Sequence, residues 1–541
     1  MEKEVEDYEL LDSGDGRKLE RFGRVTLARP CSQALWRPVQ PALWARATAS
    51  FDREAGNRWH GRQALPKDWT ISTVGMRFKL SGTDFGHLGI FPEQRAQWRW
   101  IREKINGVNG LKGSNGLKGS NGVNGLKGSN GVEGLKDVNG PEDEPVVGKA
   151  YPAWQAGHFQ IHTIYTGVAE SQLLIFPDGT SLLIDCGDHP ACNFGVNCVP
   201  ILPDQTRHSA EWIARYVLRV NPHGRNVDYM LLTHYHADHG GCTSFHAGKA
   251  PNGKYFLSGF GQAAEFLSFG TAIDRAWPDY TDPIPLLPQE VVNNMRPLYE
   301  ELVRRGTSVE KFRLEKNSDQ IRPRHGKVPG FAVEPLCANG RILLPDGTVL
   351  DPLKEYFAAV KPKSYNENAF SIGMNFTYGK FTYYTAGDMQ GISRMPDGRR
   401  IDLESDMAKA VRQVDVAKMD HHGHESMPKV LVAKLRAKVY TAGVWEQRHL
   451  TKGTMARLSD KTLYPEDRLF VPGILPSHRL ADDAGASWIA MSEPTCAQGA
   501  HVIVDVPPGG ENYTVSTVAA ADESMRVLSV RRLGSWLQEK R

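Results

Sequence analysis

The sequence predicts an α/β fold for residues 146–541, preceded by a small β-rich N-terminal domain, 1–104, and a flexible Gly/Asn-rich linker, 105–145. Three observations support this division. The 541 residues exceed the length of one ordinary domain, a short repeat changes the composition after residue 105, and strand-like and helix-like segments alternate beyond residue 146. We therefore expect two folded parts joined by a tether.

The linker is predicted from its repeats. LKGSNG occurs at 111–116, 117–122 and 126–131, and only isolated Leu or Val side chains interrupt the Gly and Asn residues. Such a stretch cannot bury enough apolar surface to offset the entropy lost on ordering. A repeat solenoid is the alternative, but three copies with a broken register are too few for one.

Composition and charge exclude several classes of protein. Hydrophobic residues make up 40% and charged residues 23%, which are globular values and exclude wholesale disorder. The formal net charge of +3 gives no whole-chain argument for binding nucleic acid or an anionic membrane. No apolar run approaches the length of a membrane span, and the acidic start MEKEVEDYELL is unlike a secretory signal. We expect a cytoplasmic protein without a membrane partner.

The seven cysteines are expected to be reduced thiols in that compartment. Cys186, Cys192 and Cys198 follow one another in steps of six residues, which matches no common zinc-ligand spacing. We therefore do not place a metal on them.

The N-terminal domain contains strand-like segments, such as Arg24–Ala28 and Ile71–Leu80, and the phrases YELLDSGDGRKLERFG, RPCSQALW and DFGHLGIFPEQRAQWRWI. These phrases resemble the N-terminal leader of class I S-adenosylmethionine-dependent methyltransferases of the rRNA type. In that family a Gly-rich strand–turn–helix follows, whereas the repeat linker follows here. We expect no methyltransferase activity; residual RNA or protein contact and an idle appendage are the two interpretations of this leader.

The C-terminal part opens with strand-like IHTIYTG, LLIFPDG and SLLIDCGD, in which PDG predicts a hairpin turn. His208–Val220 places its apolar side chains on one helical face, with Ser209 as the expected cap, and a strand follows over Val227–Thr233. In α/β folds of this order, ligands bind at the carboxyl ends of the strands.

A dense group of metal-ligand residues follows that strand. THYHADHGG contains His234, His236, Asp238 and His239, and neutral imidazole and carboxylate groups are the ligands that zinc-type ions prefer. Because alternate residues after a strand point the same way, His234 and His236 are expected to bind one ion, and the other two a second. A solvated polar loop is the alternative, and four ligands within six residues argue against it.

Four segments in order, SLLIDCGD, THYHADHGG, GKFTYYTAGD and VDVAKMDHHGHES, resemble the metallo-β-lactamase superfamily. The branch that they resemble includes the nuclease domain of DNA-uptake channels and phosphorylcholine esterases. The resemblance implies an αββα sandwich with a dinuclear site between its sheets. It implies that Asp388 bridges the two metals, that the last ligand is His421 or His422, and that Asp185 orients a ligand histidine. We favour His421 as ligand, with His422 behind it or donating a proton to the leaving group, and take Asp238, His422 and Asp388 as the catalytic residues.

One departure from the family pattern concerns a histidine that many members place before the bridging aspartate. Only His246 and His325 lie between residues 240 and 388, and neither is expected to be a ligand. The branch uses an N-x-x-S stretch instead, which Asn368 and Ser371 match. His424, directly after HHG, is the candidate for substrate contact.

An inserted cap is expected around 251–330, a stretch with several prolines. Its arginines could hold a phosphate, although a solvated charged surface is the more usual outcome. The four arginines concerned are Arg304, Arg305, Arg322 and Arg324.

These residues predict a hydrolase that uses water activated by two divalent metal ions, zinc first, with manganese or iron as alternatives. The expected substrate is a phosphoric ester, as in a phosphodiesterase or nuclease, with a small molecule or nucleic acid as its carrier. Lactone, thioester and β-lactam hydrolysis are the nearest alternatives. A redox enzyme with iron and a non-catalytic RNA-associated binding protein are the more distant ones.

Overall fold

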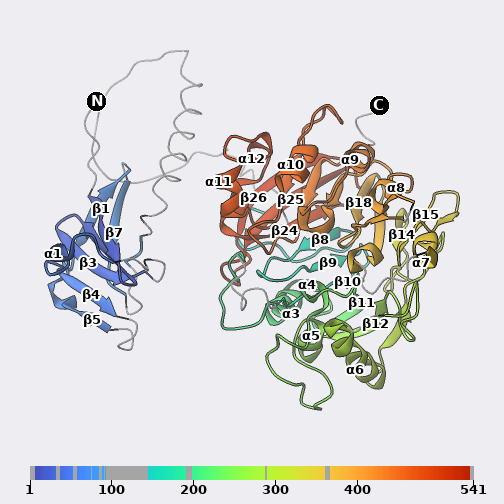
Figure 1. The fold of residues 1–541 in the computed structure, drawn as a ribbon, viewed down its shortest axis with the longest axis horizontal. Helices are drawn as coiled ribbons and strands as arrows, with labels where there is room; N and C mark the ends of the chain where they lie inside the picture. Colours follow the sequence, from blue (N-terminus) through green and yellow to red (C-terminus); the bar gives the residue numbers. More distant parts are fainter. Residues whose placement is uncertain are drawn as a thin grey trace, which may run out of the picture. The chain divides into compact units, whose positions relative to one another are not determined.

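A computed structural model gives the fold of the chain (Figure 1). It describes residues 7–31, 34, 37–52, 58–74, 76–83, 88–90, 92, 144–189, 198–286, 289–359, 366–395 and 397–536. The linker predicted over 105–145 lies outside the described residues except for 144 and 145, and Cys192 lies outside them as well. The chain divides into two compact units, Met1–Leu135 and Lys136–Arg541.

The N-terminal unit is built from strands. A five-stranded sheet has the order β1-β2-β3-β4-β5, and β6 and β7 form a separate antiparallel pair. Phe22, Leu27, Trp69 and Ile71 belong to one core, which the sheet and the pair share. The strands are β1 (Tyr8–Gly14), β2 (Arg17–Phe22), β3 (Val25–Pro30), β4 (Ala49–Asp52), β5 (Arg58–His60), β6 (Trp69–Thr73) and β7 (Met76–Leu80), with helix α1 (Pro41–Trp44) and the 3-10 turn η1 (Arg62–Ala64).

The C-terminal unit contains a nine-stranded mixed sheet in the order β13-β12-β11-β10-β9-β8-β24-β25-β26. The strands from β10 to β13 run parallel, and the others pair antiparallel. Their bounds are β8 (Phe159–Thr163), β9 (Gln172–Ile175), β10 (Ser181–Ile184), β11 (Asn226–Leu231), β12 (Ser268–Asp274), β13 (Ser308–Lys311), β24 (Ala500–Val506), β25 (Asn512–Ala519) and β26 (Val527–Gly534).

An eight-stranded mixed sheet has the order β16-β15-β14-β17-β18-β21-β22-β23. Its strands run parallel from β18 to β23 and antiparallel elsewhere. The strands are β14 (Phe331–Ala338), β15 (Arg341–Leu343), β16 (Val349–Leu350), β17 (Gly373–Tyr378), β18 (Phe381–Thr385), β21 (Val416–Lys418), β22 (Val439–Thr441) and β23 (Leu469–Val471).

The two large sheets share a core. Phe159 of β8 lies 6.1 Å from Phe376 of β17 and 6.2 Å from Phe381 of β18, between ring centroids. The opposite face of the nine-stranded sheet packs against α3 (Ser209–Val220), α5 (Phe260–Phe266) and α6 (Glu290–Arg304). Helices α8 (Leu403–Met407), α9 (Lys429–Leu435) and α10 (Lys452–Leu458) lie beside the eight-stranded sheet, away from α3, α5 and α6 (Figure 1). The predicted α/β class is confirmed.

The remaining elements of this unit are short. They are α4 (Ala237–Gly240), α7 (Lys354–Ala359), α11 (Ser477–Asp482), α12 (Ser487–Ala490), η4 (Glu367–Phe370), η5 (Asp420–Gly423), η6 (Pro494–Gln498) and the strand pair β19 (Ile392–Arg394) and β20 (Arg400–Asp402).

Residues 251–330, where the sequence suggested an inserted cap, belong instead to the nine-stranded sheet and to the helices that pack on it. Strands β12 and β13 extend the nine-stranded sheet, and α5 and α6 pack on its face. The four arginines of this stretch have partners there: Arg304 and Arg305 bind Glu301, Arg322 binds Asp319, and Arg324 binds the Tyr229 hydroxyl. One of the prolines that suggested a separate cap, Pro297, lies inside α6.

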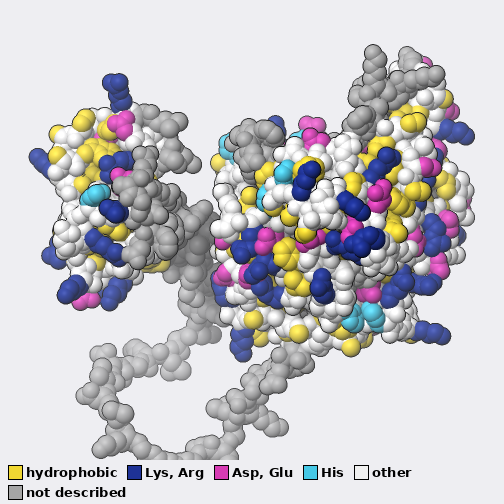
Figure 2. Space-filling view, turned by 90° about the horizontal axis from the view of Figure 1, so that it is seen from below, with side chains coloured by type: hydrophobic (Ala, Val, Ile, Leu, Met, Phe, Trp, Pro, Cys, Tyr) yellow, Lys and Arg dark blue, Asp and Glu magenta, His cyan; other side chains and the backbone are white. Residues whose placement is uncertain are grey.

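Basic, acidic and apolar side chains are interspersed on the face of the C-terminal unit that Figure 2 shows, in keeping with the small net charge. Among the described residues, no helix combines the length and the apolar character that crossing a bilayer requires. Five of the described cysteines, Cys31, Cys186, Cys242, Cys337 and Cys496, are free thiols.

Candidate metal centre

The candidate ligands meet where parallel strands of both sheets end. Asp185 directly follows β10, and the His234–His239 motif follows β11, to which β10 pairs in parallel. From the other sheet, Asp388 follows β18, and η5 with His422 follows the parallel strand β21. Because the carboxyl ends of parallel strands lie at one edge, both sheets contribute candidate ligands.

Four side chains form one tight group around a common centre. His422 Nε2 lies 2.9 Å from Asp238 Oδ2 and 3.0 Å from Asp388 Oδ2. His239 Nε2 lies 3.1 Å from Asp388 Oδ2 and 3.5 Å from Asp238 Oδ2. Donors around a tetrahedral zinc-type ion lie about 3.4 Å from one another. These four separations suit ligands of one cation, and Glu170 also belongs here, because its ligand atom and those of His239, Asp388 and His422 all lie within 4.8 Å of one another.

A second group contains three residues and shares Asp388. His234 Nε2 lies 3.1 Å from His236 Nδ1 and 3.9 Å from Asp388 Oδ2, and the ligand atoms of the three residues all lie within 4.8 Å of one another. His234 and Asp388 are buried, and His236 is half-buried. Three protein ligands leave one position of a tetrahedral ion open, which is the arrangement of catalytic sites.

Asp185 lies behind both groups and fixes two imidazoles. Its Oδ2 atom is 2.8 Å from His239 Nδ1, so the Nδ1–H donates to the carboxylate and leaves Nε2 as the acceptor. The Thr233 hydroxyl donates to the same oxygen at 2.8 Å and lies 3.1 Å from His234 Nδ1. Asp185 therefore orients His239 directly and His234 through Thr233.

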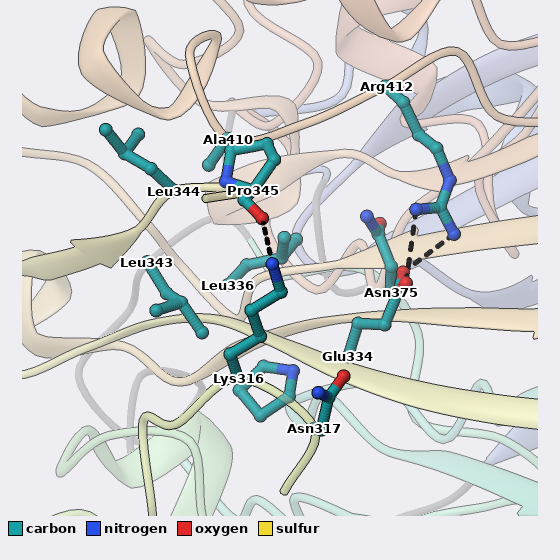
Figure 3. A pocket seen from close by; sticks show the side chains of 11 residues that line it. Lys316, Asn317, Glu334, Leu336, Leu343, Leu344, Pro345, Asn375, Ala410 and Arg412 are labelled. Carbon is teal, nitrogen blue, oxygen red and sulfur yellow. Dashed lines mark hydrogen bonds and ion pairs between the residues drawn. The ribbon is translucent and has the colours of Figure 1, made fainter. Parts of the chain in front are cut away.

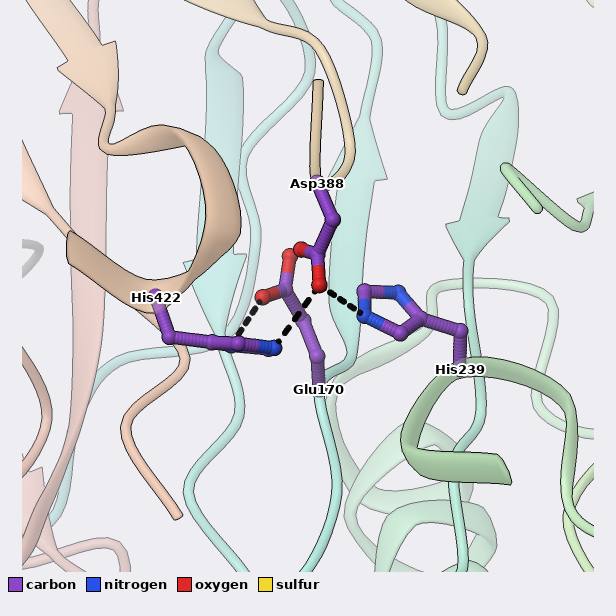
Figure 4. Close-up of side chains that lie close together, drawn as sticks. All are labelled: Glu170, His239, Asp388 and His422. Carbon is purple, nitrogen blue, oxygen red and sulfur yellow. Dashed lines mark ion pairs between the residues drawn. The ribbon is translucent and has the colours of Figure 1, made fainter. Parts of the chain in front are cut away.

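Glu170 performs the corresponding role for His422 (Figure 4). His422 Nδ1 lies 2.9 Å from Glu170 Oε2 and 2.7 Å from the carbonyl oxygen of Gly443, on the ring edge opposite Asp388. The buried Lys418 ammonium lies 2.8 Å from Glu170 Oε1 and donates to the Gly387 carbonyl at 2.5 Å. Lys418 thereby ties Glu170 to the turn that carries Asp388.

His422, and not the favoured His421, enters the group of ligand atoms. His421 and His422 both have left-handed backbones, with φ of 47° and 55°. In this turn the Nδ1–H of His421 donates to the His424 carbonyl at 2.7 Å, which leaves His421 bound within its own loop. The role of proton donor to a leaving group is therefore not open to His422, because its Nε2 faces Asp238 and Asp388.

The other candidate residues lie at the margin of the site. The Ser371 hydroxyl accepts the backbone N–H of Asp388 at 3.2 Å, and Asn368 is buried in η4. His424 is half-buried at the end of η5. His246 accepts a hydrogen bond from the Gly248 N–H, and His325 pairs with Asp228, so neither belongs to the group.

Trp445 and His449 lie against two of the candidate ligands, Asp238 and His422. The indole N–H of Trp445 donates to Asp238 Oδ2 at 2.8 Å. The His449 ring stacks on His422, with centroids 4.6 Å apart and planes 3° apart. Sequence reasoning missed both residues. It also missed Glu170, which has no ligand residue beside it, and Lys418, whose side chain is not of a metal-ligand type.

Burial and charge act against each other at the ligands. Burial disfavours the charged form of His239, but Asp388, Asp238 and Asp185 outweigh it and raise the His239 pKa well above its usual value. The His422 pKa is raised well above normal for the same reason, by Asp388 and Asp238 against burial.

The pKa values of the carboxylates Asp388 and Asp238 are shifted in the opposite direction, downward. Burial favours the neutral acids, but the positive charges of His239 and His422 outweigh it and hold the pKa of Asp388 well below normal. In the metal-free chain, the positive charge of the protonated imidazoles therefore takes the place of the cations.

The donor set fits a pair of divalent ions. His239 Nε2 and Asp388 Oδ1 are buried and make no hydrogen bond with any described residue. Imidazole nitrogens and carboxylate oxygens without a thiolate suit zinc, manganese and iron. The residues present therefore fit the predicted group.

A pocket of about 290 Å³ lies apart from these ligands, along β14 and β17 (Figure 3). Within it Lys316 donates to the Pro345 carbonyl, and Arg412 pairs with Glu334. None of the candidate ligands lines this pocket, so it has no part in the metal centre.

Comparisons with known proteins add little. No protein-family model and no curated protein matches the chain. Among solved structures, an S-adenosylmethionine-dependent methyltransferase from Agrobacterium tumefaciens is 40% identical over 19% of this chain and 33% of that chain, with a TM-score of 0.18. This chain therefore spans about a third of that structure's length, and such a TM-score carries no argument about fold.

Proposed function

We propose that the chain is a metal-dependent hydrolase of the metallo-β-lactamase superfamily that binds two divalent cations. One observation carries the proposal: Asp388 Oδ2 belongs both to the four-ligand group and to the three-ligand group. A carboxylate with two oxygens and a full negative charge is suited to bridging two dications. Two packed mixed sheets that bring their strand ends to one edge also suit the sandwich of that superfamily.

In this proposal His234, His236 and Asp388 would hold the first cation, and Asp238, His239, His422 and Asp388 the second. When bound, two such cations would lower the pKa of a water molecule and polarise the bond to be hydrolysed. The residues of the chain hold this arrangement: Asp185 and Glu170 fix the imidazoles, and the Trp445 indole fixes Asp238. The half-buried His424 is the residue that we assign to contact with the leaving group.

The substrate that we propose is a phosphoric diester, with lactones, thioesters and β-lactams as alternatives. Phosphoryl oxygens carry negative charge that two cations stabilise, which favours the ester of phosphoric acid. A panel of bis(p-nitrophenyl) phosphate, a lactone, a thioester and a β-lactam, each assayed with zinc, manganese or iron, discriminates among the four classes.

The proposed metal centre is tested by replacing its shared ligand. We expect the full chain to bind two cations and hydrolyse bis(p-nitrophenyl) phosphate. Asp388→Asn should lower turnover by about 10³-fold or more and reduce the metal content, because the bridge loses its charge. Metal content is measured by mass spectrometry of the purified chain.

Asp346→Asn, in an exposed turn, is the matched control and should change neither quantity. Replacing His234 and His236 together by Ala should leave at most one cation per chain. Wild-type turnover in the Asp388 variant would refute the proposed centre.

A further inference from the structure

A second pocket adjoins the loop that carries His422. It has a volume of about 600 Å³ and lies among the segment after η5, the β20–α8 segment, and the first turns of α9 and α10. Its lining side chains include Arg400, Lys429, Lys452 and Arg457. A pocket of this size can hold a nucleotide-sized group.

The pocket and the metal centre share one loop. Glu425, which lines the pocket, follows His422 by three residues, so their Cα atoms are at most about 11 Å apart. The side-chain amide of Gln390, two residues after Asp388, donates to the Glu425 carbonyl at 3.2 Å. The loop from His422 to Glu425 therefore borders both the candidate ligands and the pocket.

The pocket has an excess of positive charge. Arg400 is paired with Asp402, whereas Lys429 and Lys452 are exposed and form no ion pair with another described residue. Glu404 is buried and accepts the Met427 N–H at 2.6 Å, and burial together with Asp420 raises its pKa well above normal, so it adds little negative charge. The exposed Glu425 carboxylate also lines the pocket, so an anion would meet two ammonium groups against this one carboxylate.

The wall of the pocket nearest His422, residues 425–427, is held by hydrogen bonds. Arg457 donates to the carbonyls of Met427 and Ser426 at 2.9 and 2.7 Å. Glu425 and Met427 have left-handed backbones, with φ of 50° and 61°, a conformation that persists only where the surroundings impose it. A preorganised wall of this kind lowers the entropic cost of binding a ligand on either side of it.

We propose that this pocket binds a second phosphate of the substrate, on the far side of the loop from the bond that is cleaved. The inference rests on the proposed hydrolase function and adds the substrate class: a phosphodiester that carries another phosphate nearby. Lys429 and Lys452 supply charge-assisted hydrogen bonds to that phosphate.

The test compares two thymidine dinucleotides, one with a 5′-terminal phosphate and one without, as substrates of the full metal-loaded chain. The wild type should favour the phosphorylated dinucleotide in kcat/KM. The double variant Lys429→Ala/Lys452→Ala should lose about 10-fold or more on that substrate through KM, and should keep its rates on the other dinucleotide and on bis(p-nitrophenyl) phosphate. Lys434→Ala, an exposed cation on α9 outside the pocket, is the matched control and should change none of these values.

Direct titration of the phosphorylated dinucleotide separates this inference from the proposed function. If the wild type hydrolyses nothing but binds that dinucleotide about 10-fold more tightly than the double variant does, the hydrolase proposal fails and the phosphate site stands. If the wild type hydrolyses bis(p-nitrophenyl) phosphate but the double variant binds and cleaves the phosphorylated dinucleotide as the wild type does, the phosphate site is refuted.

Discussion

Three of the four candidate ligand imidazoles, those of His234, His239 and His422, have a partner for the second nitrogen, and their pKa values determine how the site should respond to pH. His239 and His422 have pKa values raised well above normal by carboxylates, whereas burial, His239 and His236 lower the His234 pKa well below normal. A cation must displace the protons of the first two residues but finds His234 already neutral.

Metal affinity should therefore fall as the pH is lowered, and more steeply at the four-ligand group. Below the raised pKa values, bound protons stabilise the metal-free state and compete with the cation. The logarithm of the association constant should therefore rise by one to two for each pH unit at the four-ligand group, and by less than one at the three-ligand group. Competition with a chelator between pH 6 and 8, corrected for protonation of the chelator, measures both slopes. Equal, flat slopes would contradict the assignment of His239 and His422.

Glu170 offers a second prediction at this scale. Glu170→Gln removes the negative charge behind His422 without changing the shape of the side chain, and the loss of such a partner typically lowers metal affinity by about 10- to 100-fold. Glu334→Gln, half exposed and distant in the fold, should leave the affinity unchanged. Titration of the metal-free chain measures the effect, and an unchanged affinity would show that Gly443 alone orients His422.

Single residues also mark where sequence reasoning ends. The His-x-His-x-Asp-His motif can be recognised because its candidate ligands are adjacent in the sequence. Glu170 has no ligand residue beside it, and only the packing of the β8–β9 segment against the other sheet brings it to His422. The choice between His421 and His422 depends on two left-handed backbone angles, which the letters HHG do not specify.

At the scale of elements, local sequence periodicity predicted the helices and strands better than the position of a segment in the chain predicted its place in the fold. The α/β class followed from alternating strand-like and helix-like segments, and the helix predicted over His208–Val220 spans Ser209–Val220 in the structure. Its N-cap is His208, and the expected cap residue, Ser209, donates instead to the Thr166 carbonyl. The supposed cap over 251–330 joined the sheet because β12 pairs with β11 and β13 pairs with β12, and no local pattern encodes such long-range contacts.

The contact between the loop after β10 and α4 gives a prediction about stability. A Cβ atom on Gly187 would lie 1.7 Å from the Asp238 carbonyl oxygen, so Gly187→Ala must displace α4. We expect a loss of about 1–3 kcal/mol or more in the free energy of unfolding, together with a loss of metal, because Asp238 moves. Urea denaturation and metal analysis measure the two effects.

Gly326→Ala is the control for this substitution. Its Cβ would meet nothing closer than 3.8 Å, so its unfolding free energy should stay within about 0.5 kcal/mol of the wild type. A Gly187 variant as stable as this control would contradict the close packing of the loop on α4.

At the scale of the whole molecule, the two units have separate cores. The described core residues of the N-terminal unit form one cluster, and those of the C-terminal unit form two others, with no member in common. Residues 136–541 alone should therefore fold, bind two cations and keep the turnover of the full chain within about twofold. Circular dichroism and the assay with bis(p-nitrophenyl) phosphate test this; a fragment that aggregates or loses its metals would show that the first unit is needed.

The division of the ligands between two sheets has a mechanical consequence. Because His239 follows a strand of one sheet and His422 a strand of the other, a bound cation would link two halves of the chain that already meet through apolar packing and through polar contacts such as Lys418 with Glu170. Removal of metal by a chelator should therefore lower the melting temperature of the chain, and each tenfold rise in free zinc above the dissociation constant should restore about 1.4 kcal/mol of unfolding free energy.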